Sequence, residues 1–160
     1  MNTKEYMWFW KLISCVLAVV LGVSFICGHA QGETIIQEPT QEELEEEFYY
    51  DSLEMMALCV MAEAGGECEM GIRLVADTIL NRVDSEKFPD TIWEVIFQPR
   101  AFSCVDNGMI DKVEPTEEVF RIITEELENR TDYRPLYFRT ERYADYGTPL
   151  YNVGNHYFSE

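Results

Sequence analysis

One carboxylate in this sequence is placed where a protein can use it as an acid. An apolar run from Leu58 to Ala62 leads to Glu63, and Gly65 and Gly66 then end the helix that this run predicts. The C-terminal end of a helix carries unpaired carbonyl groups and the negative end of the dipole, which disfavour a further negative charge. Apolar neighbours disfavour it as well, so we expect Glu63 to be held toward its protonated form. A neutral carboxylic acid is the general acid that cleavage of a glycosidic bond requires.

Glu67 is the second acid of this segment. It lies beyond the glycines, beside Cys68 and Glu69, where we expect more solvent around the side chain. We therefore place Glu67 among the substrate contacts rather than at the reacting bond. A glutamate near a helix end is most often only solvated, so the local sequence makes Glu63 a candidate that needs support from the rest of the chain.

Histidine is scarce, which limits the alternative chemistries. The sequence has 2 histidines, and only His156 lies beyond the first 30 residues. A zinc hydrolase uses about three protein ligands that usually include several histidines. We therefore expect no metal and no other cofactor. No Gly-x-Ser-x-Gly segment occurs, so a serine hydrolase of that type is not indicated.

Cys104 and His156 provide the main competing site. A cysteine and a histidine that are distant in sequence can meet as a nucleophile and its base, which would make the protein a wall peptidase inhibited by iodoacetamide. Ser103-Cys104-Val105 follows a predicted short helix but does not open one, so nothing in the sequence indicates a lowered thiol pKa. We expect Cys104 to lie in a loop or a disulfide.

The elements that position these groups follow from the spacing of apolar residues. Helical spacing predicts helices at 52–64, with Ser52 as its N-cap, at 69–83, at 91–97 and from Pro115 to about Asn129. We expect a loop over 99–111. Two aromatic segments, 136–139 and 156–159, are typical of short strands. The sequence therefore predicts a mainly helical α+β fold with a small β element near the C-terminus.

The last third of the chain is rich in tyrosine, asparagine and glycine. Aromatic faces stack on sugar rings, and amides and hydroxyls fix the ring orientation, so this composition is typical of a carbohydrate-binding groove. We expect three residues of this part of the chain to contact substrate: Tyr137, Asn155 and His156.

The first thirty residues are not typical of a folded domain. Residues 1–30 carry Lys4 and Lys11 near an apolar run and end in small residues, which is typical of a signal peptide cleaved before Gln31. Residues 7–27 are also long enough to serve as an uncleaved membrane anchor. Both interpretations predict a secreted or otherwise extracytoplasmic protein.

Residues 31–52 are predicted to be an acidic linker, and the segment from Gln41 to Leu53 can form a nascent helix that leads into the domain. Residues 53–160 are predicted to be one domain, which we expect to be monomeric. The net charge is −18, and from Met55 onward 20 acidic residues face 10 Lys and Arg. This charge excludes nucleic acid as a partner.

Three cysteines lie beyond the predicted leader, residues 1–30. One disulfide with a free thiol, and full reduction of all three, are the open alternatives.

A series of motifs resembles one known family. The segment Met61-Ala-Glu-Ala-Gly-Gly-Glu67, with Ile79-Leu-Asn-Arg-Val83 after it, is similar to the SleB-type cell wall hydrolases, which include spore cortex-lytic enzymes. The likeness runs in chain order from Leu53 to Ser159. It continues through Lys87-Phe-Pro89, Thr91-Ile92, Val95-Ile-Phe-Gln-Pro99, Phe102-Ser103, Gly108, Leu136-Tyr-Phe138 and Gly154-Asn-His-Tyr-Phe158.

The resemblance implies a compact domain like those of lysozymes and lytic transglycosylases. It implies cleavage of peptidoglycan between N-acetylmuramic acid and N-acetylglucosamine, with Glu63 in the place of the family's catalytic acid. Met61 replaces the tyrosine that usually precedes this acid. The family commonly has Gly-Gln-Phe-Ser where this chain has Arg100-Ala101-Phe102-Ser103, so substrate contacts here are expected to differ. Phe102 and Ser103 keep the family's types and are expected to bind substrate.

Lytic transglycosylases in this family imply a mechanism with one carboxylate. Glu63 protonates the glycosidic oxygen and then accepts the proton of the C6 hydroxyl of muramic acid, which closes onto C1 as a 1,6-anhydro ring. A hydrolytic muramidase would need a second carboxylate, for which Glu67 and Asp77 are candidates. Thr78 and Asn81 are expected to hydrogen-bond the sugar or a water near the acid. A non-catalytic wall-binding domain is the remaining alternative.

Overall fold

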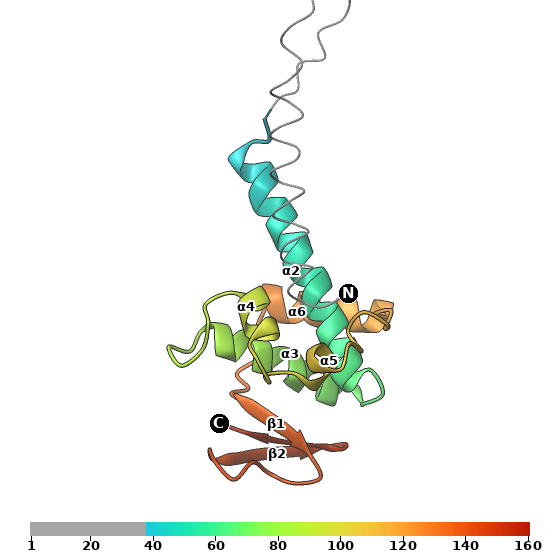
Figure 1. The fold of residues 1–160 in the computed structure, drawn as a ribbon, viewed down its shortest axis with the longest axis vertical. Coiled ribbons are helices and arrows are strands. Elements are labelled where there is room, and N and C mark those ends of the chain that lie inside the picture. Colours follow the sequence, from blue (N-terminus) through green and yellow to red (C-terminus); the bar gives the residue numbers. More distant parts are fainter. Residues whose placement is uncertain (1–37) are drawn as a thin grey trace, which may run out of the picture. The chain divides into compact units, whose positions relative to one another are not determined.

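Helix α2 (Gln41–Ala64) is the longest element of the computed structural model, which describes residues 38–160 (Figure 1). It begins at Gln41, so the predicted start at Ser52 is wrong, whereas the helix that the sequence allowed from Gln41 is present and continuous with it. The Thr40 hydroxyl accepts a hydrogen bond from the Glu43 N–H at 3.3 Å, and the Glu43 carboxylate accepts one from the Thr40 N–H at 2.7 Å. This capping box starts the helix within the acidic segment. Ser52 lies inside α2 and is buried.

The helical layer is built around α3 (Glu69–Val83), which contacts α2, α4 (Ile92–Phe97) and α6 (Glu117–Glu128). All three helices agree with the predicted ones, and Thr91 and Thr116 cap α4 and α6. The predicted loop over 99–111 is only partly correct, because it contains the one-turn helix α5 (Ser103–Asp106). Cys104 therefore does lie in the first turn of a helix.

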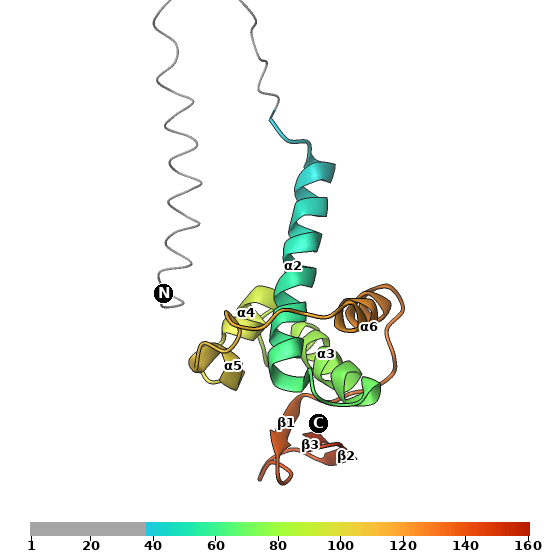
Figure 2. The same ribbon diagram turned by 90° about the vertical axis from the view of Figure 1, so that its right-hand side faces the viewer.

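A three-stranded antiparallel sheet completes the fold. Its strands are β1 (Tyr137–Thr140), β2 (Pro149–Val153) and β3 (His156–Ser159), in the order β1-β3-β2. Figure 1 and Figure 2 show the sheet at one end of the helical layer, and β1 contacts α3. The sequence predicted β1 and β3 but not β2, which opens on a proline and has no regular apolar alternation. The mainly helical α+β fold is confirmed.

The turn between β2 and β3 requires glycine. Gly154 has φ +57°, which glycine adopts at little cost, and a Cβ there would lie 1.7 Å from Glu67 Oε2. The absence of this Cβ allows Asn155 to donate to Glu67 from its side-chain amide at 2.8 Å and from its backbone N–H at 3.3 Å. Glu67 thus joins the α2–α3 connection to the sheet.

A buried acidic pair lies between α3 and α6. Glu126 is fully buried, binds Arg73 and accepts the Thr131 N–H at 2.9 Å, while the Thr131 hydroxyl lies 2.9 Å from Asp77 Oδ2. Burial, with the neighbouring Glu126, raises the pKa of Asp77 to about 7. At Glu126, burial acts to raise the pKa of the carboxyl group, but the hydrogen bonds from Thr131 and Arg73 outweigh burial and lower this pKa. Below neutral pH the pair therefore holds one proton, on Asp77, and this proton is lost as the pH rises through about 7.

Substitution Asp77→Asn should change how stability depends on pH. The raised pKa means that Asp77 binds its proton more tightly in the folded state, so its stabilising effect is complete below pH 3.8 and is lost as pH rises to about 7. Asparagine keeps a donor toward Glu126 without an ionisable proton. In urea unfolding, we expect the variant to gain about 3–4 kcal/mol relative to wild type between pH 4 and pH 8, because each unit of the raised pKa corresponds to about 1.4 kcal/mol. An equal difference at both pH values would contradict the assignment.

The predicted leader, 1–30, lies outside the described residues, as does most of the predicted linker. Between residues 38 and 160, no helix combines the length and the apolar character needed to cross a bilayer.

Candidate active site

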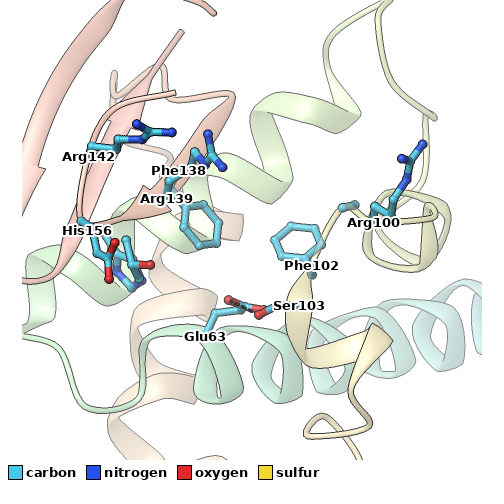
Figure 3. Close-up of a pocket in the computed structure, with 11 residues that line it drawn as sticks. Glu63, Arg100, Phe102, Ser103, Phe138, Arg139, Arg142 and His156 are labelled. Atoms are coloured by element: carbon cyan, nitrogen blue, oxygen red, sulfur yellow. Dashed lines mark hydrogen bonds between the residues drawn. The ribbon is translucent and has the colours of Figure 1, made fainter. Parts of the chain in front are cut away.

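A cavity of about 600 Å³ opens where the end of α2, the segment around α5, and the sheet come together. Figure 3 shows Glu63 between a wall that carries Arg100, Phe102 and Ser103 and a wall that carries strand residues. The lining residues are Glu63, Arg100, Ala101, Phe102, Ser103, Phe138, Arg139, Thr140, Glu141, Arg142 and His156.

Glu63 lies in the last turn of α2 and is held by the first turn of α5. The Cys104 N–H donates to Glu63 Oε1 at 2.8 Å, and the Ser103 hydroxyl donates to the same oxygen at 3.1 Å. The carboxylate thus meets hydrogen-bond donors on one side, where the sequence led us to expect only apolar neighbours. These two donors to Oε1, with a longer contact of 3.5 Å from the Ser103 hydroxyl to Oε2, fix the position of the group.

An aromatic cluster forms the sheet side of the cavity. The ring centroids of Phe138 and His156 are 5.2 Å apart, and those of Phe102 and Phe138 are 6.1 Å apart. His156 is 4% exposed, and its Nδ1 has no hydrogen-bond partner among the described residues. The aromatic rings of this cluster suit the apolar face of a sugar, and the Nδ1 atom of His156 is itself buried.

Three arginines of the cavity were not predicted as site residues. Arg100 precedes α5, Arg139 lies in β1 and Arg142 follows it. The only signal in the sequence was the departure at Arg100 from the family's glycine. Phe138 was also missed in favour of Tyr137. Phe138, Arg139 and Thr140 all line the cavity although successive strand residues point to opposite faces, so strand periodicity could not show that this end of β1 borders it. Tyr137 instead contacts Phe88 and Tyr146.

Two predicted sugar contacts on α3 do not reach the cavity. Thr78 is fully buried and donates to the Leu74 carbonyl at 2.8 Å. Asn81 donates to the carbonyls of Tyr133 and Pro135 at 3.1 and 3.0 Å. The polar groups of both residues are satisfied within the protein, and Asn81 supports the connection between α6 and β1, so we do not retain either residue as a substrate contact.

The structure also shows which acidic residues could supply a second carboxylate in the cavity. Asp77 is buried beside Glu126, and Glu67 is bound to Asn155, so neither lines the cavity. Glu141 does line it and is exposed. Of the remaining predicted contacts, Phe102, Ser103 and His156 line the cavity, whereas Glu67, Tyr137 and Asn155 lie outside it.

The cysteines are arranged differently from a thiol active site. The Sγ atoms of Cys59 and Cys104 are 3.9 Å apart, both side chains are buried, and no disulfide is formed among residues 38–160. Burial, together with Cys104, raises the pKa of the Cys59 thiol. Within the same residues, no hydrogen bond joins Cys104 Sγ to His156, so the geometry does not support a Cys-His nucleophile.

Comparisons with known proteins point to one family. A sequence model of the family described as Cell Wall Hydrolase matches residues 66–159. The matched region begins just after Glu63. The spore cortex-lytic enzyme of Oceanobacillus iheyensis is 48% identical over 60 residues, which cover 38% of this chain and 22% of that protein. The Bacillus subtilis spore cortex-lytic enzyme is 29% identical over 119 residues, covering 71% of this chain and 39% of that protein. The chain thus matches less than half the length of these relatives.

Solved structures share the fold. The catalytic domain of the Bacillus cereus SleB protein has a TM-score of 0.61 and 28% identity, covering 82% of this chain and 100% of that one. The catalytic domain of SleB from Bacillus anthracis, described as a germination-specific lytic transglycosylase, has a TM-score of 0.61 and 32% identity, covering 69% of this chain and 94% of that one.

Proposed function

Because this chain belongs to the cell wall hydrolase family, we propose that it cleaves the glycan strands of peptidoglycan, between N-acetylmuramic acid and N-acetylglucosamine, with Glu63 as the general acid. The observation that carries the proposal is the position of Glu63. It borders an open cavity with aromatic walls, and donors from Ser103 and Cys104 orient its carboxyl group.

We propose a lytic transglycosylase reaction, because among the described residues the only other carboxylate that lines the cavity is that of the exposed Glu141. Glu63 protonates the glycosidic oxygen as the bond to C1 of muramic acid breaks. The resulting carboxylate then takes the proton of the C6 hydroxyl, whose oxygen bonds to C1 and yields the 1,6-anhydro end. The nucleophile belongs to the substrate, so one protein carboxylate is sufficient. The donors from α5 would stabilise that carboxylate between the two proton transfers.

A hydrolytic muramidase is the second candidate, because Glu141 is a further carboxylate on the cavity wall. In this reaction a water attacks C1, and the second carboxylate serves as base or nucleophile. The product would then carry a reducing muramic end in place of an anhydro ring.

Product analysis distinguishes the two reactions. Purified sacculi would be digested with the protein, and the soluble fragments identified by mass spectrometry. We expect anhydro ends, which are one water (about 18 Da) lighter than the reducing products of hydrolysis. Reducing ends would overturn the transglycosylase proposal and direct attention to Glu141→Gln. Binding to sacculi without release of fragments would identify a non-catalytic wall-binding domain.

This function requires the protein to act outside the cytoplasmic membrane. We propose that residues 1–30 direct export, as a cleaved signal peptide or through anchoring by residues 7–27, that 31–52 serve as a spacer, and that 53–160 act as a monomeric catalytic domain without a metal or other cofactor.

A further inference from the structure

The candidate site is cationic in a strongly acidic protein. The net charge is −18, yet Arg100, Arg139 and Arg142 all line the cavity beside Glu63. Within residues 38–160, Arg100 and Arg139 form no ion pair, and Arg142 has only an exposed contact of 3.8 Å with Asp145. Of the arginines elsewhere, Arg73, Arg121 and Arg130 bind acidic side chains, and Arg82 is buried and donates to the Leu136 carbonyl. Arg134 is exposed and forms no ion pair among the described residues, but it lies outside the cavity.

Arg100 occupies a backbone position that suits glycine. Its φ is +66°, in the left-handed region that L residues other than glycine, asparagine and aspartate rarely adopt. Neither a hydrogen bond nor an ion pair of the described residues uses its guanidinium group. Backbone strain of this kind is concentrated at binding and catalytic sites. The side chain at this position therefore points to a ligand rather than to a role in folding.

The two unpaired arginines stand on opposite sides of the acid. In Figure 3, Arg100 lies on the wall next to α5, whereas Arg139 and Arg142 lie on the sheet wall, with Glu63 below and between them. A guanidinium group binds carboxylates through two parallel hydrogen bonds. The other carboxylate of the cavity, Glu141, lies on the sheet side, in the loop between Arg139 and Arg142. An anionic group of the substrate is therefore best accommodated between Arg100 and Arg139.

We infer that Arg100 and Arg139 bind a carboxylate of the muramic acid stem peptide, so that the enzyme prefers glycan strands that carry these peptides. The inference rests on the proposed function. While muramic acid carries its peptide, its lactyl carboxyl is an amide and the sugars of the strand are uncharged, so the carboxylates are those of the stem peptide. Strands in which these carboxylates are amidated would give the arginines no partner. Recognition at this site thus selects for wall whose stem peptides carry free carboxylates.

Three soluble substrates from one preparation test the inference. Uncrosslinked glycan strands, freed of teichoic acid so that no polymer phosphate is present, would be used in three forms. The first is intact, the second has its peptides removed by amidase and the freed lactyl carboxylates amidated, and the third keeps its peptides with their carboxylates amidated. We expect kcat/KM to be about fivefold to tenfold higher on intact strands than on the other two, as for partly exposed ion pairs acting together. The preference should fall in 0.5 M salt, because salt screens exposed charges.

Substitutions of the arginines, tested on the same three substrates, are the second part of the experiment. Arg100→Gly suits the left-handed backbone and should fold normally, and with Arg139→Gln it should reduce the preference for intact strands to near unity. Arg100→Lys keeps the charge and should retain much of the preference. Arg134→Gln, which removes an exposed arginine outside the cavity, should keep it fully.

Each outcome has a distinct meaning. Equal rates on all three strands would overturn the inference and leave the proposed function standing. Equal rates on intact and amidated strands, with slower cleavage of peptide-free strands, would also overturn it, because the peptide would then be recognised without its charge. Failure to cleave any of the strands would overturn the proposed function itself.

Discussion

Glycan cleavage should fall by a factor of about 10²–10⁴ when Glu63 is replaced by glutamine, as is usual when a general acid is lost. Glutamine has the same shape, and its amide oxygen can still accept the hydrogen bonds from the Cys104 N–H and the Ser103 hydroxyl. What it lacks is the proton that the glycosidic oxygen must receive. The rate of fragment release from purified sacculi, measured for both proteins, checks this expectation.

The control for this experiment is Glu128→Gln, which removes an exposed carboxylate at the end of α6 and should leave the rate unchanged. Equal thermal unfolding of the Glu63 variant and wild type would show that the lost activity is chemical. Iodoacetamide provides an independent check. Cys104 is buried against Cys59, so alkylation of the folded protein should spare activity. Activity that survives Glu63→Gln but is lost on alkylation would instead favour the thiol peptidase.

The largest effect on stability is expected from Arg73→Met. Arg73 binds Glu126, whose side chain is fully buried, and also Glu69 and Glu125 at the surface. Removal of the guanidinium leaves the Glu126 carboxylate inside the protein without its cation. Breaking a buried pair in this way typically costs 3–5 kcal/mol. We expect a loss of about this size in the free energy of unfolding, measured by urea denaturation.

A double variant separates the cost of the unpaired charge from the loss of packing. Adding Glu126→Gln to Arg73→Met removes that charge and should recover part of the stability, so the two effects should not be additive. Arg121→Gln is the matched control, because Arg121 binds Glu69 and Glu125 only at the surface. It should cost less than about 1 kcal/mol. A loss as large for Arg121→Gln as for Arg73→Met would contradict the importance of burial.

Much of the fold was predictable because the signals that define it are local. The apolar stripe of α3, the threonine caps of α4 and α6, and the aromatic segments of β1 and β3 each lie within a few residues of the element they specify. The signal for the start of α2 is also local, although we placed that start wrongly. The capping box at Thr40 and Glu43 was present in the sequence, but we gave more weight to the run of like charges that follows it.

The sequence by itself determined the family, the mainly helical α+β fold and the candidate acid at the end of a helix, since each depends on residue types at short spacing. Only the tertiary structure decided what surrounds that acid. It brought Ser103 and the Cys104 N–H to Glu63, placed Arg100 opposite Arg139, and enclosed Thr78 in the core. Periodicity shows that a residue lies on a given face of a helix or strand, but which distant segment covers that face depends on packing between elements far apart in the chain.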